Sequence, residues 1–283
     1  MRSLKKSLSF TGSFAMLSAF ILSGCGGAAD KDAEANREAA DSIKKEVVLT
    51  ADQHNLLYSF PTPFEVTTML EKAKAGYIFD ITNSPGNVTR YGTEFKKALN
   101  LGVYSADLSY STTYNRIDET NKFLACTGKL ADELGIAGVY DQTLLEKVKK
   151  YGNNKDTLVG IITRVLSSTN DFLSKNNRNQ VAVLIVTGGF VEGMYLAISL
   201  NEVARDNRQI VTVILQQKEN FDKLLTILDA YHNDTEMSVI KNEVAKLDKI
   251  FTGFDLKPGE KVPMQKAAEM TDLAEYVRLG FVK

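Results

Sequence analysis

Residues 181–200, VAVLIVTGGFVEGMYLAISL, are the most apolar stretch of the sequence, and the fold class depends on their structure. A continuous buried helix would place them at the centre of an all-α bundle. A strand over VAVLIV that turns at Thr187-Gly188-Gly189 into a helix would indicate an α/β fold, and the β-branched residues favour a strand locally. A membrane span would contain Glu192 and three glycines. We favour the buried helix, because only residues 209–215 offer a second candidate strand, and these continue naturally as a helix.

Helical patterns lie on both sides of this stretch. Thr62-Pro63-Phe64-Glu65 predicts a helix start with a capping box, and Leu134-Gly135 predicts a helix end. Residues 80–92, DITNSPGNVTRYG, predict a loop, and Gln265 to Leu279 predict a terminal helix. We therefore expect one all-α domain, a bundle of about eight to ten helices, from residue 45 to 283. Apolar residues at helical spacing support it: Ile117, Thr120, Leu124, Thr127 and Ala131; Leu158, Ile161, Ile162, Val165, Phe172 and Leu173; Ile210, Ile214, Phe221, Leu224, Leu225, Leu228 and Tyr231.

Two short segments resemble each other. Gly102-Val103-Tyr104-Ser105-Ala106 is similar to Gly193-Met194-Tyr195-Leu196-Ala197, 91 residues further on. Both lie in apolar stretches, and both precede a long amphipathic pattern. The pair is consistent with a duplicated multi-helix unit, although five positions can match by chance.

Two carboxylates stand in apolar surroundings. Helical spacing places Asp107 on one face with Tyr104, and Glu192 comes one turn before Tyr195. Burial of an unpaired carboxylate costs several kcal/mol, so each needs a partner or a raised pKa. The four residues would form either a satisfied structural network, which we favour, or a polar ligand pocket inside the bundle. Candidate partners are tyrosine hydroxyls, Arg116 and Arg164.

Several function classes are disfavoured. With 34 basic and 35 acidic residues, the chain lacks the cationic excess of a nucleic-acid binder. Two histidines and two cysteines leave little for a metal or haem site, and no Gly-x-Ser-x-Gly, His-Glu-x-x-His or Cys-x-x-Cys motif occurs. Residues 187–193 have the wrong spacing for a dinucleotide fingerprint, so their glycines indicate close helix packing. A hydrolase based on Asp107 and Glu192 would need both carboxyls in an open cleft, about 5–10 Å apart. We expect no catalytic residue, no metal and no cofactor, and a buried, inert thiol at Cys126.

The first residues have the pattern of an export signal. Arg2, Lys5 and Lys6 precede an apolar run from Leu8 to Ile21, which is shorter than the ~20 residues of a membrane span. Leu22-Ser23-Gly24-Cys25 looks like a bacterial lipobox, which implies cleavage before Cys25 and acylation of that residue. The alternative is an ordinary signal peptide with a chance cysteine. We expect a signal peptide over 1–24 and an acylated, flexible tether over 25–44.

The chain resembles a group of uncharacterised lipoproteins from Bacteroidetes. The resemblance rests on the lipobox, on residues 100–110 (NLGVYSADLSY) and on residues 188–195 (GGFVEGMY). It implies an all-helical periplasmic or outer-membrane lipoprotein and carries no activity or site. No Asp follows Cys25 directly, which favours the outer membrane, and acidic residues start only at Asp30, which favours the periplasmic face over the cell surface.

These observations predict a lipid-anchored envelope lipoprotein. Its expected role is that of a non-enzymatic interaction or scaffold protein, held at the membrane through Cys25 and facing an envelope protein partner. The alternative is a small-molecule carrier whose polar pocket is built from Tyr104, Asp107, Glu192 and Tyr195.

Overall fold

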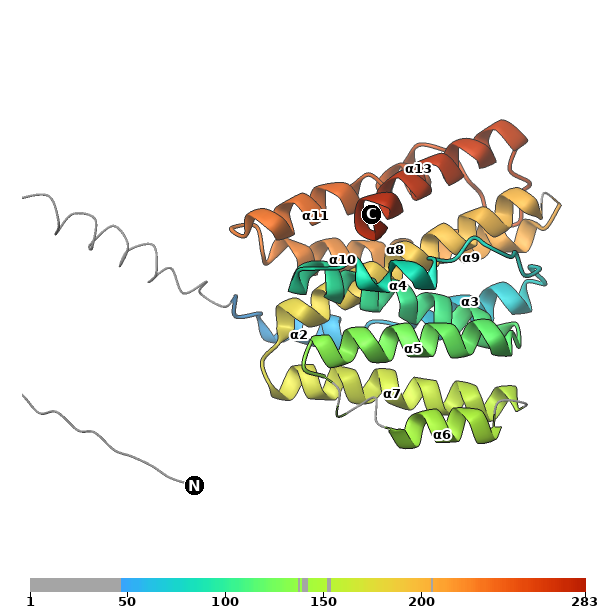
Figure 1. Ribbon diagram of the computed structural model, residues 1–283. Coiled ribbons are helices and arrows are strands. Elements are labelled where there is room, and N and C mark those ends of the chain that lie inside the picture. Colours follow the sequence, from blue (N-terminus) through green and yellow to red (C-terminus); the bar gives the residue numbers. More distant parts are fainter. Residues whose placement is uncertain (1–46, 137, 139–141, 152–153, 205) are drawn as a thin grey trace, which may run out of the picture. The chain divides into compact units, whose positions relative to one another are not determined.

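The computed structural model describes residues 47–136, 138, 142–151, 154–204 and 206–283, and all regular elements in these ranges are helices (Figure 1). The predicted all-α, multi-helix fold is confirmed. The predicted signal peptide and tether lie outside the described residues. The elements are α2 (Ala51–Tyr58), α3 (Pro63–Lys72), η1 (Pro85–Thr89), α4 (Glu94–Thr113), α5 (Ile117–Glu133), α6 (Gln142–Tyr151), α7 (Lys155–Lys175), α8 (Asn179–Val203), α9 (Arg208–Gln216), α10 (Lys218–Asp229), α11 (Thr235–Ala245), α12 (Asp248–Thr252) and α13 (Met264–Val282).

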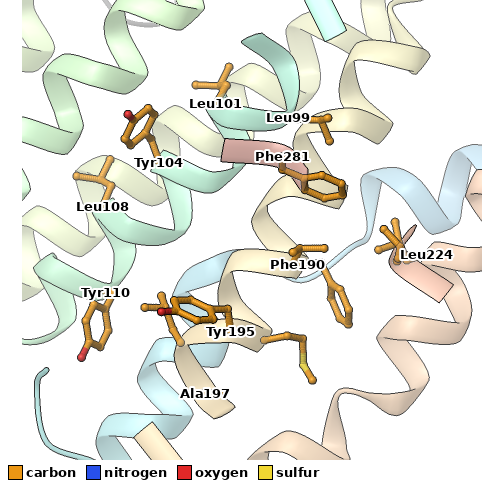
Figure 2. Packing of buried hydrophobic residues seen from close by; sticks show 14 of the residues in the cluster. Leu99, Leu101, Tyr104, Leu108, Tyr110, Phe190, Tyr195, Ala197, Leu224 and Phe281 are labelled. Atoms are coloured by element: carbon orange, nitrogen blue, oxygen red, sulfur yellow. The ribbon is translucent and has the colours of Figure 1, made fainter. Parts of the chain in front are cut away.

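Helices α4 and α8 form the centre of the bundle and make its most extensive helix contact. Helix α5 packs beside α4, and α13 packs on α8 (Figure 1). Every residue of α4 from 98 to 113 is buried. Figure 2 shows the side chains that line this core, with Tyr104 and Leu108 on α4 and Phe190 and Tyr195 on α8. The residues of greatest chemical interest therefore lie on α4 and α8, the two most buried helices of the bundle.

The most apolar stretch is one continuous helix, α8. The alternative with a strand over VAVLIV is wrong, because the backbone passes through Thr187-Gly188-Gly189 without leaving the helix. Among the described residues, α8 is long and apolar enough to cross a membrane, but 89% of its most apolar window is buried inside the protein. Its hydrophobicity is therefore used to pack against neighbouring helices, as the favoured interpretation predicts.

Glycines let α4 and α8 approach each other closely. A Cβ on Gly102 would lie 2.0 Å from the carbonyl oxygen of Ile185, and one on Gly188 would lie 1.9 Å from that of Leu99. Both distances are far inside van der Waals contact, so any side chain here would force the helices apart. Gly193 differs, because a Cβ there would meet no atom within 4 Å. The prediction of close packing is confirmed for Gly188 but not for Gly193.

Helix boundaries agree with the predicted signals. Thr62 and Glu65 form a capping box with Pro63 in the first turn of α3. Gly135, at φ +70°, ends α5, and Ile136 donates its N–H to the Ala131 carbonyl in the manner of a Schellman motif. The terminal helix α13 contains the predicted residues and is longer at both ends.

Two details of the pattern are different from expectation. The apolar residues from 210 to 228 belong to two helices, because α9 ends and α10 begins at Gln217, and Tyr231 follows α10 in a turn. The predicted loop over residues 80–92 contains the short 3₁₀ helix η1. The two similar five-residue segments lie on α4 and α8, but their glycines are not equivalent, since Gly102 is at the helix contact and Gly193 is not.

Candidate functional site

The structure brings Asp107 and Glu192 together at the centre of the bundle. Asp107 lies on α4 and Glu192 on α8, and both residues are 0% exposed. Arg278 reaches them from α13, and its Nε donates a hydrogen bond to Glu192 Oε2 at 2.6 Å. We call these three residues the carboxyl–guanidinium cluster. It joins α4, α8 and α13, three helices that come from distant parts of the chain.

The loop before α4 closes the cluster. The backbone N–H of Asn83 donates to Asp107 Oδ2 at 3.0 Å, and the Asn83 side-chain amide donates to the Tyr91 hydroxyl at 2.9 Å. Asn87 in turn donates to Asn83 Oδ1 at 2.9 Å. Asn83 is itself buried, so this turn is a fixed part of the site.

The surroundings of Asp107 favour its protonated, neutral form. Asp107 Oδ1 and Glu192 Oε1 are both buried, and no N–H or O–H group from elsewhere in the described chain donates to either oxygen. Burial raises the pKa of Asp107 well above its ordinary value, and the charge of Glu192 raises it further, while Arg278 opposes the shift. We infer that Asp107 is protonated in the folded protein and that Glu192 is the acceptor for this proton. One proton, one carboxylate and one guanidinium make the cluster neutral overall, which removes most of the cost of burying it.

Both predicted tyrosines are buried, but they have different neighbours. The Tyr104 hydroxyl donates to the Ser84 carbonyl at 2.7 Å, and burial raises its pKa. The Tyr195 ring lies beneath the guanidinium of Arg278, 4.5 Å from its Cζ, and burial raises the pKa of this tyrosine too. Of the two tyrosines, Tyr195 therefore contacts the cluster directly, and Tyr104 holds the turn over it.

The predicted partners Arg116 and Arg164 are wrong. Arg116 lies over the Phe79 ring and pairs with Glu119, and Arg164 donates to the Gly160 carbonyl on its own helix. The partner is Arg278, which sequence reasoning missed together with Asn83. The sequence does contain a signal for Arg278, because this residue comes four positions after Ala274, which belongs to a buried apolar stripe. That stripe on α13 is Ala267, Met270, Ala274, Val277 and Phe281.

The cluster is built to hold a proton and an ion pair. Acid–base cleavage of a glycosidic bond needs two carboxyls that face an open cleft, whereas Asp107 and Glu192 are fully buried and bonded to protein groups. Among the described residues, no group of three or more His, Cys, Asp and Glu side chains could hold a metal ion. The guanidinium of Arg278 already occupies the position where a cation would be attracted.

Cys126 is a buried thiol on α5, on the face it shares with buried Phe123 and Leu130. Its Sγ lies 3.8 Å from the Pro85 carbonyl oxygen. Burial raises its pKa to about 11. These surroundings disfavour the thiolate, so they fit the predicted inert thiol.

Comparisons of the chain with models of protein families, with curated proteins and with solved structures find no match.

Proposed function

We propose that this chain is a lipid-anchored protein of the bacterial cell envelope that acts by binding a protein partner rather than by catalysis. The lipobox at residues 22–25 supports the anchor, with Cys25 as the acylated residue. The absence of Asp after Cys25 and the late start of the acidic residues support the outer membrane and its periplasmic face. The helical domain would then be presented to its partner on the tether.

The complete burial of Asp107 and Glu192 is the main support for a non-catalytic role. These residues are the strongest candidates for acid–base chemistry in the sequence. One oxygen of each residue is hydrogen-bonded: Asp107 Oδ2 accepts from Asn83, and Glu192 Oε2 accepts from Arg278, which links α8 to α13. A buried ion pair that links two helices at the centre of the bundle supports a role in which the outer surface makes the functional contacts.

The second function considered, a carrier with a polar pocket, has less support. It needs a cavity bounded by Tyr104, Asp107, Glu192 and Tyr195. The cavities described in the structure are lined by other residues. We therefore propose the interaction role for this chain and do not assign a ligand to those four side chains.

Mass spectrometry of the N-terminal peptide from cells tests the anchor. The proposal predicts that the mature chain begins at Cys25 and that this residue carries acyl chains. A mature chain that begins elsewhere, or an unmodified Cys25, would contradict the anchor. The inhibitor of lipoprotein signal peptidase should leave the full precursor uncleaved in the same experiment.

Photo-crosslinking in cells tests the interaction. A photoreactive amino acid is placed in turn at exposed apolar positions, Phe79, Val203, Val239 and Tyr276, with buried Phe221 as the matched control. The proposal predicts one discrete adduct with a protein partner from at least one surface position and none from Phe221. If all four surface positions give no adduct in cells that express the chain normally, the interaction role is wrong.

A further inference from the structure

An open groove of about 570 Å³ lies between α6 and α7. The two helices pack together at the edge of the bundle (Figure 1). None of the residues of the carboxyl–guanidinium cluster lines this groove. It is therefore a separate feature of the surface, independent of the interaction role proposed above.

Each of the two helices contributes a stripe of side chains to the groove. The residues of each stripe have the three- and four-residue spacing that places side chains on one helix face. They are Lys147, Lys150 and Tyr151 on α6, and Thr157, Ile161 and Arg164 on α7. Ile161 is buried and forms the floor, whereas the cations and Tyr151 are exposed. The groove is therefore apolar at its base and cationic along its sides.

The positive charges of the groove are not neutralised by the described part of the chain. Lys147, Lys150 and Arg164 line it together with one carboxylate, Glu146, which gives the lining a net charge of +2. Within the described ranges, none of these four residues forms an ion pair. By contrast, Lys155 at the start of α7 pairs with a carboxylate of α3 at 2.5 Å. An anion that enters the groove would supply the missing counter-charge.

The cations also keep hydrogen-bond donors available. Arg164 donates from Nε to the Gly160 carbonyl, and no described group accepts from either of its Nη atoms. Lys150 Nζ lies 5.2 Å from the centre of the Tyr151 ring, and no oxygen of the described chain accepts from it. A guanidinium presents its donors in a planar fork that matches the oxygens of phosphate or carboxylate groups. An oxyanion in the groove would therefore find donors on both helices.

We propose that this groove binds a phosphorylated small molecule, with the phosphate held between the cations of α6 and α7 and the organic part packed against Tyr151 and Ile161. A phosphate monoester carries a charge of about −1.5 to −2 at pH 7 and three strong acceptor oxygens. It therefore matches the net charge of +2 on the lining, whereas a single carboxylate would neutralise half of it.

The size and the number of charges favour a small molecule over a larger anionic surface. A volume of about 570 Å³ lies within the range of roughly 300–1,000 Å³ for small-molecule sites, so the groove has room for an organic group beside the phosphate. Attraction to an anionic membrane takes clusters of about four to eight Lys and Arg residues, and this groove has three cations. A nucleic acid requires a cationic excess that the chain lacks, with 34 basic and 35 acidic residues.

The test uses the full chain in phosphatidylcholine nanodiscs, with 3-fluorotyrosine placed at Tyr151 and phenyl phosphate as the probe. Fluorine NMR at pH 7.5 then reports binding at the groove itself. We expect a saturable shift of the Tyr151 resonance with phenyl phosphate, a weaker response to inorganic phosphate and none to phenol. The matched control carries 3-fluorotyrosine at Tyr276, an exposed tyrosine of α13 on the opposite side of the bundle (Figure 1), and its resonance should not move.

Charge-removing variants test the role of the cations. Arg164→Gln should weaken the binding of phenyl phosphate at least ~tenfold, because it removes charged hydrogen-bond donors. Lys150→Gln should weaken it in the same direction, so the result does not depend on one variant. Both side chains are exposed, so neither change should prevent folding. Arg208→Gln on the exposed surface of α9 is the matched control and should bind as the unmodified chain does.

Three results would overturn the proposal. The first is a Tyr151 resonance that does not move at several millimolar phenyl phosphate, or that moves equally with phenol. The second is equal affinity in the unmodified chain, Arg164→Gln and Lys150→Gln. The third is a shift of Tyr151 when phosphatidylglycerol replaces half of the nanodisc lipid but not when phenyl phosphate is added, since this would assign the groove to a lipid surface.

Discussion

Arg278 Nε donates to Glu192 Oε2 at 2.6 Å, and this contact connects the terminal helix α13 to the buried centre of α8. The guanidinium is almost as buried as the carboxylate, with side-chain exposures of 8% and 0%. A buried ion pair of this kind contributes little compared with an apolar pair of equal volume, but breaking it leaves one uncompensated charge. The contact therefore makes the bundle sensitive to the loss of either partner alone.

Arg278→Met should destabilise the protein by about 3–5 kcal/mol, because Glu192 and Asp107 would remain buried without a cation. Urea unfolding followed by circular dichroism measures the change. Arg208→Met on the exposed surface of α9 is the matched control and should change the free energy of unfolding by less than about 0.5 kcal/mol. The double variant Glu192→Met/Arg278→Met should recover much of the loss. Equal losses in Arg208→Met and Arg278→Met would contradict the ion pair's importance.

Asp107→Asn should stabilise the protein, and the gain should increase with pH. The folded state raises the pKa of Asp107, so it binds the proton more tightly than the unfolded chain. The stabilisation from this proton is complete below the unfolded pKa of ~3.9 and is lost as pH rises toward the folded pKa, at up to about 1.4 kcal/mol per pH unit. An asparagine keeps the hydrogen bond accepted from Asn83 and offers Glu192 an N–H donor without needing a proton.

Unfolding curves of Asp107→Asn and the unmodified chain at several pH values between 4 and 8 check this prediction. The difference in free energy should rise with pH over this range. A constant difference, or a variant that is less stable at neutral pH, would show that Asp107 is ionised in the folded protein.

The two glycines of α8 should respond in opposite directions to alanine. Gly188→Ala places a Cβ 1.9 Å from the Leu99 carbonyl oxygen, so α4 and α8 must separate and the protein should lose about 3 kcal/mol or more. Gly193→Ala places its Cβ in open space and should gain about 0.5–1 kcal/mol through helix propensity. Thermal unfolding of both variants measures the effect. Similar effects at both positions would mean that the helix contact is not as close as described.

The Cys126 thiol should be unreactive in the folded protein. Because burial raises its pKa to about 11, the reaction with an aromatic disulfide reagent at pH 8 should be slower by roughly two orders of magnitude than in urea. A Cys25→Ser chain leaves Cys126 as the sole thiol, since the sequence has two cysteines. Rapid modification without urea would contradict the burial of this side chain.

Local patterns were sufficient to predict the fold class. The capping box at Thr62 and the helix end at Gly135 depend on residues within one turn, so the sequence contains the whole signal. The break at Gln217 was not predicted, because apolar spacing continues through it from α9 into α10. Periodicity detects helices but not the point at which one buried helix gives way to the next.

The candidate site was predicted only in part. The cost of burying a carboxylate identified Asp107 and Glu192 as residues that need partners, and the structure places them together. The partner Arg278 is 86 residues from Glu192 in sequence, and nothing local distinguishes it from Arg116 or Arg164 except its position beside the apolar stripe of α13. The contact of Asn83 with Asp107 uses a backbone N–H, which any residue except proline would offer, so the sequence carries no specific signal for it.

The central claim is that Asp107 and Glu192 form a sealed structural pair with one shared proton. Isotope-edited infrared difference spectroscopy tests it directly, because a protonated carboxyl has a C=O stretch that an ionised carboxylate lacks. The account predicts a protonated carboxyl at neutral pH in the unmodified chain, its disappearance in Asp107→Asn, and its persistence in the exposed control Asp132→Asn. A spectrum without any protonated carboxyl at neutral pH would mean that both groups are ionised, and the account of the cluster would be wrong.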